Sequence, residues 1–475
     1  MLKFVFRGGS MIHYKNLDLM QFGKKNVFPD GLNRLSVLRF VLVIMILILP
    51  LVATACDQET DSPDKEESEQ QYSVSEKHSD IDEPISLKDK DSEQLVEGVR
   101  ANPMSKLEIV SVENHQPALE PRSVGIDDRI YGTGEGNTLW RGSDAFEDME
   151  IFTGEDVFDF QSHGYGTPYF VTRTASGYIV VTDGESEENR GAIFFSENFT
   201  QGYELKEEFT YDHHPIMFGN TWYHGEYEPE QIVLLAERGD GKGKLWATFD
   251  GGKSWENIRT AERFDEDQQL HHHTAVYDPY QGRIWNSQGD GANAALYISD
   301  DLGKSWRNIS GEIETDLPHN QFQPTLLAPT MHTIIFGGDS GGTHAGLLEI
   351  PRDHDFEGNQ ENFVLERAIG VWDQQPTYKQ YGTAPYAQED SEIYIVLPSA
   401  YDDEKRAFVV GSGDHGRSFH LLGTYPNHHL EYGEQLTLGI VGPCRDGYLY
   451  GIWDTEADEH TMVVFDPPEW EAATE

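Results

Sequence analysis

The stretch TFDGGKSW, residues 248–255, recurs as SDDLGKSW at residues 299–306 and as SGDHGRSF at residues 412–419. The three copies share the pattern Ser/Thr-x-Asp-x-Gly-x-Ser-aromatic. In this pattern the Asp carboxylate can accept backbone N–H bonds across a turn, the Gly can adopt a positive φ, and the aromatic ring can be buried beneath the turn. Each copy therefore predicts the same β-hairpin turn, and a repeated turn indicates repeated structural units.

The repeat has a length that is typical of propeller blades. From about residue 125 onward, short strand-like runs are bounded by Gly, Asp and Asn, and no long segment has a helical apolar period. The runs end at Asp144, Asp183, Asp240, Asp290, Asp339, Ser399 and Asp454, which are 39 to 60 residues apart. A period of about 50 residues with about four strands per unit predicts an all-β fold, a seven-bladed β-propeller of four-stranded antiparallel blades. Six or eight blades are the alternatives.

The repeated motif resembles the Asp box, or BNR repeat, of the sialidase-like β-propeller superfamily. The resemblance covers roughly residues 125–470, and a degenerate fourth copy, SENFTQGY, starts at Ser196. It implies that the boxes are structural turns on the outer rim and that a carbohydrate site lies at the propeller mouth. A calcium loop built from the box oxygens is the alternative interpretation of the same residues.

Residues 1–56 resemble a bacterial lipoprotein signal. Arg34 and Arg39 precede the apolar run 40–52, and small residues lead from it to Cys56. The resemblance implies that Cys56 is lipidated and that the protein is exported and membrane-anchored, in the periplasm or at the cell surface. A plain membrane anchor is the alternative. Since Cys444 is the one other cysteine, no disulfide framework is expected.

Charge divides the rest of the chain and excludes one class of partner. Residues 57–120 begin with a charged stretch that is poor in apolar side chains, which predicts a disordered acidic linker before a propeller domain at 121–475. The whole chain has 83 Asp plus Glu against 35 Lys plus Arg, a formal net charge of −48. Such a chain is not expected to bind nucleic acid, because it cannot release the counterions of a phosphate backbone.

One position recurs at the predicted opening of each inner strand, where the central channel of a propeller begins. Its residues are Tyr131, Tyr165, His224, His273, Gln323, Tyr381 and Tyr432. Residues two positions earlier share the same face of an extended chain, and they are Arg129, His163, Trp222, His271, Gln321, Lys379 and Leu430. We expect these side chains to converge at the channel mouth, with His272 pointing into the packing between blades.

The predicted mouth is chemically suited to a glycan or polysaccharide, because Tyr and Trp rings match the flat faces of sugars. Expected ligand-binding residues are Tyr131, Trp222, Gln321, Lys379 and Tyr432. Propeller polysaccharide lyases use His or Tyr as acid and base, with Arg or a bound metal neutralising a uronate carboxylate. Likeness to them implies catalytic roles for Arg129, His163, Tyr165, His271 and Tyr381, and a divalent metal bound by His224, His271, His273 and Gln323.

Several functions stay open on this sequence. A classical sialidase is not expected, because the RIY stretch at Arg129 lacks the Pro of the Arg-Ile-Pro motif and no second and third arginine stand out. The alternatives are a lyase or glycosidase acting on acidic polysaccharide, a non-catalytic glycan-binding module, and an assembly or scaffold protein that uses an acidic outer surface. The repeated polar positions would also suit a channel that merely binds ordered water.

Overall fold

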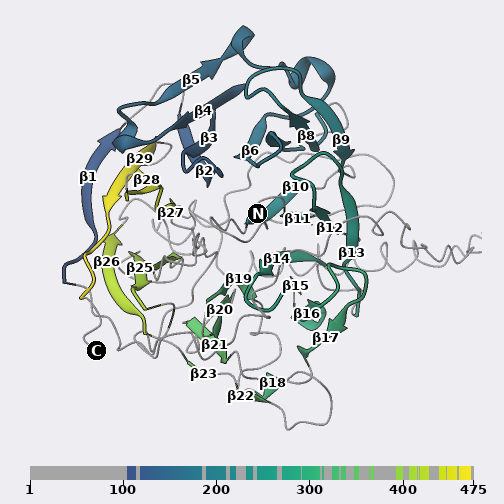
Figure 1. Ribbon diagram of the computed structural model, residues 1–475, viewed down its shortest axis with the longest axis vertical. Helices are drawn as coiled ribbons and strands as arrows, with labels where there is room; N and C mark the ends of the chain where they lie inside the picture. Colours follow the sequence, from purple (N-terminus) through teal and green to yellow (C-terminus); the bar gives the residue numbers. More distant parts are fainter. Residues whose placement is uncertain are drawn as a thin grey trace, which may run out of the picture. The chain divides into compact units, whose positions relative to one another are not determined.

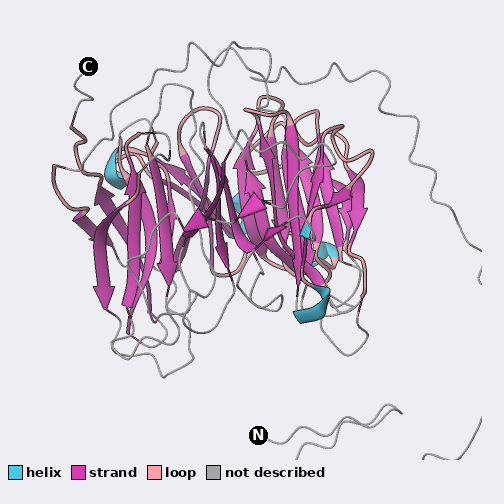
Figure 2. Ribbon diagram, turned by 90° about the horizontal axis from the view of Figure 1, so that it is seen from below, coloured by secondary structure: helices cyan, strands magenta, loops and turns pink. Residues whose placement is uncertain are grey.

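The strands form sheets that are arranged around a common axis, and in each four-stranded sheet one edge strand lies nearest the axis (Figure 1). Seen from the side, the strands run from one face of the ring to the other (Figure 2). The computed structural model describes residues 104–113, 118–184, 189–209, 214–220, 232–238, 243–264, 270–289, 291–310, 313–314, 324–330, 333–338, 347–351, 363–364, 366–367, 392–398, 406–414, 416, 418–426, 438–444, 447–456 and 459–471. These residues belong to one compact unit, Val74–Glu475.

Six of the described sheets have four antiparallel strands each. Two of them are β2 (Leu119–Val124), β3 (Ile130–Gly134), β4 (Thr138–Gly142) and β5 (Glu150–Thr153), and β6 (Pro168–Arg173), β7 (Tyr178–Thr182), β8 (Ala192–Ser196) and β9 (Glu204–Glu208). Two more are β10 (His214–Asn220), β11 (Val233–Arg238), β12 (Lys244–Thr248) and β13 (Glu256–Thr260), and β14 (His271–Asp278), β15 (Arg283–Gly289), β16 (Ala295–Ser299) and β17 (Arg307–Asn308). The last two are β19 (Pro324–Pro329), β20 (Thr333–Gly338), β21 (Leu347–Pro351) and β23 (Glu366–Arg367), and β27 (Leu438–Val441), β28 (Leu449–Glu456), β29 (Glu459–Asp466) and β1 (Glu108–Glu113).

The described residues also form a sheet of three strands, β24 (Ile393–Pro398), β25 (Arg406–Ser412) and β26 (His420–Pro426). A separate parallel pair joins β18 (Ile313–Glu314) to β22 (Phe363–Val364). The predicted all-β propeller with four-stranded antiparallel blades is thus confirmed. Six blades are complete within the described residues, against the seven that the sequence predicts. No helix in these ranges is long and apolar enough to cross a membrane.

The N-terminal strand closes the ring. β1 pairs antiparallel with β29, so it is the outer strand of a sheet whose other three strands come from the C-terminal end of the chain. This strand lies within residues 57–120, the range predicted to be a linker, and β2 begins at Leu119. The sequence EIVSVE of β1 breaks strict alternation at Ile109 and Val110, where the strand has a bulge, and this gives only a weak strand signal beside an acidic stretch.

Apolar side chains fill the space between neighbouring sheets. Between the β10–β13 and β14–β17 sheets, for example, Leu234 and Ala236 pack with Ala275 and Tyr277. Seven clusters of this kind occur among the described residues, each between two adjacent sheets. Both faces of a sheet are therefore buried, which explains why strands such as β7, YIVVT, are apolar at nearly every position.

The three copies of the repeated turn, residues 248–255, 299–306 and 412–419, have the same hydrogen bonds. In the second copy, one oxygen of Asp301 accepts from the Ser299 hydroxyl and the Ser305 N–H, each at 2.8 Å, and the other accepts from the Ser305 hydroxyl at 2.6 Å. The Gly303 N–H donates to Ser299 Oγ at 2.7 Å, and Gly303 has a φ of +89°. The bonds and the positive φ expected from the sequence are present in all three turns.

Each repeated turn also contacts the preceding sheet. Thr174 and Ser176, in the turn after β6, donate to the carbonyl oxygens of Gly251 and Asp250 at 2.7 and 3.0 Å. A Cβ atom added to Gly252 would come within 2.7 Å of Ile179, and one on Gly303 within 2.7 Å of Ile258. These glycines are therefore required by the close approach of the preceding blade as well as by their positive φ.

We predict that Asp301→Ala lowers the free energy of unfolding by about 2–3 kcal/mol, because it removes three hydrogen bonds worth about 1 kcal/mol each. Asp301→Asn keeps two acceptor contacts and should cost less than half as much. Urea unfolding of the full chain measures both. Asp300→Ala is the matched control, since its exposed carboxylate makes a surface ion pair with Arg283. Equal losses for Asp300→Ala and Asp301→Ala would contradict the assignment.

Candidate functional site

The three histidines that open β14 alternate between two faces of this inner strand. His271, His272 and His273 are all buried, with 6, 0 and 3% of their surfaces exposed. The ring centroids of His271 and His273 are 4.9 Å apart, so these two side chains share a face. The His273 ring lies on the backbone of Gly289 in β15, where an added Cβ would come within 2.3 Å of it. Two imidazoles are therefore held together at the opening of a first strand.

His272 points the other way, toward the β10–β13 sheet. An added Cβ on Gly243, which precedes β12, would lie 3.6 Å from the His272 ring. Neither ring nitrogen has a partner at normal hydrogen-bond geometry. Burial lowers the pKa of His272 well below 6.5, and the neighbouring charge of Arg259 lowers it further. His272 is therefore a neutral side chain packed between two blades, the position predicted for it.

Arg259 of β13 forms a buried polar network that the sequence analysis missed. Its terminal nitrogens donate to Asn286 Oδ1 at 2.6 Å and to Gln288 Oε1 at 2.7 Å, and its guanidinium lies 3.4 Å from the ring centroid of Tyr297. These bonds join the β10–β13 and β14–β17 sheets. Burial lowers the pKa of Arg259 to about 10. The signal in the sequence is the polar run Asn286, Ser287 and Gln288, which follows Ile284 and Trp285 in β15 and is fully buried.

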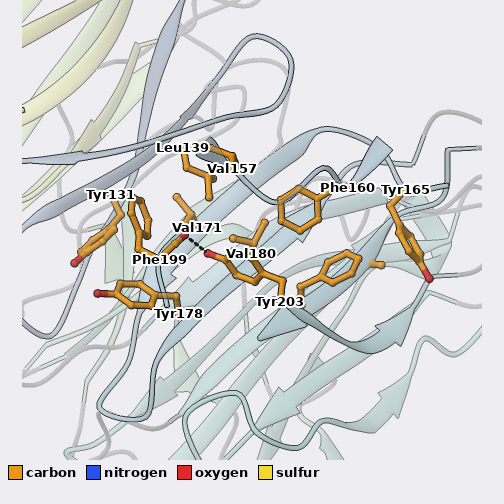
Figure 3. Close-up of a cluster of buried hydrophobic side chains, with 12 residues drawn as sticks. Tyr131, Leu139, Val157, Phe160, Tyr165, Val171, Tyr178, Val180, Phe199 and Tyr203 are labelled. Carbon is orange, nitrogen blue, oxygen red and sulfur yellow. Dashed lines mark hydrogen bonds between the residues drawn. The ribbon is translucent and has the colours of Figure 1, made fainter. Parts of the chain in front are cut away.

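Tyr165 and His163 precede β6, the first strand of its sheet. The Tyr165 ring is buried in the apolar cluster drawn in Figure 3, and its hydroxyl donates to Glu208 Oε1 at 2.8 Å. Arg190 forms an ion pair with Glu208 and lies over the Tyr165 ring. Burial raises the pKa of Tyr165, and the bond to Glu208 raises it further. His163 is exposed and stacks on Phe158, with ring centroids 4.8 Å apart.

Arg129 and Tyr131 were predicted to line the same mouth, and this prediction is wrong. β2 is the first strand of their sheet, and Tyr131 lies in the second strand, β3. Both residues therefore lie at the end of the sheet opposite to the opening of β14. Tyr131 is fully buried and donates to Asp127, while Arg129 pairs with Asp148 at 2.6 Å. The run LEPRSV contains Pro121 and Arg122 and was not recognised as a strand.

The remaining predicted residues lie outside the described ranges: Cys56, Trp222, His224, Gln321, Gln323, Lys379, Tyr381, Leu430 and Tyr432. Two members of the predicted metal set, His271 and His273, are described. Among the described residues, no group of three or more His, Cys, Asp or Glu side chains is placed to hold a metal ion.

Comparison with known proteins gave no matching family model. A segment of 71 residues, 15% of the chain, is 32% identical to "Uncharacterized protein YCR101C" of Saccharomyces cerevisiae. The match spans about a third, 35%, of the length of that curated relative.

Three solved structures are similar at low sequence identity. The β-propeller domain of the Trilobed protease from Pyrococcus furiosus is 9% identical, with a TM-score of 0.46 over 78% of this chain and 99% of that one. YCF48 bound to D1 peptide is 11% identical, with a TM-score of 0.44 over 77% and 97%. The GH74 enzyme of Niastella koreensis is 11% identical, with a TM-score of 0.44 over 77% and 56%.

We predict that His272 makes the protein less stable at acidic pH. The folded state keeps this side chain neutral, whereas the unfolded chain takes up its proton as the pH falls through 6.5. Stability from this group is thus present above pH 6.5 and is lost below it. As the pH falls from 7.5 to 5, unfolding of the His272→Phe variant should come to take up about one proton fewer than unfolding of the wild type. Urea unfolding at several pH values measures this, with His163→Phe, at an exposed histidine, as control. If the free energy of unfolding depends on pH in the same way in His272→Phe and in the wild type, the assignment of a buried neutral His272 is contradicted.

Proposed function

We propose that this chain is an exported, membrane-anchored propeller of the Asp-box type that binds glycans at its channel mouth. The apolar run 40–52 before Cys56 supports export and lipidation. The common hydrogen bonds of the turns at 248–255, 299–306 and 412–419 support the Asp-box assignment.

We infer seven blades from the position of the repeated turn. In two complete sheets this turn joins the third strand to the fourth, β12 to β13 and β16 to β17. In the three-stranded sheet it joins β25 to β26. By this correspondence β24 is a second strand, and the first strand of its blade is expected within residues 368–391, which include Lys379 and Tyr381. The seven apolar clusters between adjacent sheets support the same number.

The observation that carries the proposed function is the pair of imidazoles at the start of β14. His271 and His273 share one face at the opening of a first strand. Gln323 comes directly before β19, which is also a first strand, whereas the Tyr165 hydroxyl bonds to Glu208 of the outer strand β9 and lies away from this group. Aromatic rings and hydrogen-bonding groups from separate blades are thus expected at one mouth, the combination that sugar rings and hydroxyls need.

Binding is favoured over catalysis by the state of the predicted catalytic residues. Tyr165 holds its proton in a bond to Glu208 with a raised pKa, and Arg129 is paired with Asp148 at the other end of its sheet. A lyase or glycosidase on acidic polysaccharide is the second candidate. It would use a divalent metal at His224, His271, His273 and Gln323, the feature that distinguishes it from simple binding.

We predict that Gln323→Ala weakens glycan binding at least tenfold, or about 1.4 kcal/mol, because it removes a hydrogen-bonding group from the mouth. Binding of the full chain to immobilised neutral and uronate polysaccharides measures this. Lys253→Ala, an exposed change in a turn at the other end of its sheet, is the control. Equal glycan binding by the wild type, Gln323→Ala and Lys253→Ala would contradict the mouth assignment.

Two further readouts separate the alternatives. New ultraviolet absorbance from unsaturated sugar ends, together with stoichiometric bound metal, would establish the lyase. An absence of glycan binding across the panel would leave the assembly or scaffold function.

A further inference from the structure

A cavity of about 320 Å³ lies on the outer part of the β2–β5 and β6–β9 sheets, away from the openings of the first strands. Its lining comes from the strands β4, β5 and β7 and from the turn that follows β8, and the residues are Arg141, Phe152, Tyr178, Glu197, Asn198, Phe199 and Thr200. Its volume is at the lower end of the range of small-molecule sites, roughly 300–1,000 Å³. It would hold a ligand of about one ring.

Three aromatic rings form the apolar walls of this cavity. The Phe199 ring centroid is 5.6 Å from that of Phe152 and 5.2 Å from that of Tyr178, with interplanar angles of 80° and 52°. Behind them the buried Tyr131 packs on Phe199 at 5.5 Å and on Tyr178 at 6.0 Å (Figure 3). The walls are therefore supported by the layer between the two sheets. The Arg141 guanidinium borders the same rings, at 5.3 Å from the Phe199 centroid and 5.9 Å from the Phe152 centroid, so a ligand would lie beside it.

Polar groups with spare hydrogen-bonding capacity surround these rings. Arg141 donates through Nε to Glu150 at 2.6 Å, and no described residue accepts from its terminal nitrogens. Asn198 Oδ1 accepts from the Thr200 N–H at 3.0 Å, which fixes the turn and leaves the side-chain NH₂ as a donor. Glu197 is exposed at the edge and adds an acceptor. Hydrogen-bond donors and acceptors thus surround the aromatic walls of the cavity.

The charges of the cavity restrict the class of ligand. The positive charge of Arg141 is compensated by Glu150, and Glu197 adds a negative charge, so an anionic ligand gains nothing here. The chain as a whole is also strongly acidic. A ligand with a flat apolar face, several hydroxyls and no charge satisfies both the rings and the polar groups.

We propose that this cavity binds an uncharged pyranose unit, as a sugar site separate from the channel mouth. The rings of Phe152, Phe199 and Tyr178 contact the faces of the sugar. Arg141 and Asn198 donate to its hydroxyls, and Glu197 accepts from one of them. The site goes beyond the mouth proposed above and does not depend on it.

Saturation-transfer NMR on the full chain tests this proposal, with the methyl glycosides of glucose, galactose, mannose and xylose, and methyl glucuronide as the charged probe. In the Gln323→Ala background, which removes the mouth site, we expect saturation of at least one neutral glycoside, reduced at least fivefold when Phe152→Ala is added. Ile151→Ala is the matched control, since Ile151 is the exposed neighbour of Phe152 on β5. Asn198→Ala, in the exposed turn, is a second variant if Phe152→Ala unfolds.

Three results would overturn the proposal. The first is no saturation of any neutral glycoside by the wild type, and the second is saturation of methyl glucuronide alone. The third is a signal that persists in folded Phe152→Ala or Asn198→Ala but is lost in Gln323→Ala, which would assign the bound sugar to the mouth. Loss of the mouth signal in Gln323→Ala, with the Phe152-dependent signal retained, supports two separate sites.

Discussion

Pairing of β1 with β29 is the constraint on which the rest of the structure depends. Each sheet buries both faces against its neighbours, so an open ring would expose two apolar sheet faces at once. The register runs from Glu108 opposite Asp466 to Glu113 opposite Met462. The backbone just before β1 extends the closure, because Leu107 donates to Leu422 of β26 and Met104 to Glu469. One short strand thus holds together segments from both ends of the chain.

Hydrogen bonds between polar groups fix how adjacent blades align, whereas apolar side chains fill most of the space between them. The repeated turns hold an Asp carboxylate in three hydrogen bonds and bring a glycine against the preceding sheet. The Arg259 network does the same deeper in the interface, where a guanidinium is bound by neutral amides and an aromatic ring. Since a buried charge without acceptors is costly, this network specifies one alignment of the two sheets. The cavity beside Phe199 is supported instead by the apolar layer between the β2–β5 and β6–β9 sheets.

The sequence predicts the fold well because the repeat and its turn are local signals. The pattern from Ser299 to Trp306 encodes its own hydrogen bonds, and the spacing of strand endings gives the blade architecture. Short strands without a clean pattern were missed. Overlooking β2 moved Arg129 and Tyr131 to the wrong end of their sheet, since a shift of one strand exchanges the two faces of a propeller. The Arg259 network and the cavity depend on contacts between blades, which no single stretch of sequence contains.

Closure of the ring can be measured directly with a disulfide between the two strands. Glu108 and Asp466 are paired and exposed, and the Cα atoms of paired antiparallel residues are about 4.5–5.5 Å apart, within the range that a disulfide spans. In the full chain carrying Cys56→Ser, the pair Glu108→Cys and Asp466→Cys should oxidise to an intramolecular bond, seen as a linked peptide by mass spectrometry, and raise the midpoint of thermal unfolding. Two thiols that stay reactive under oxidising conditions, or that link only different molecules, would contradict closure of the propeller by its N-terminal strand.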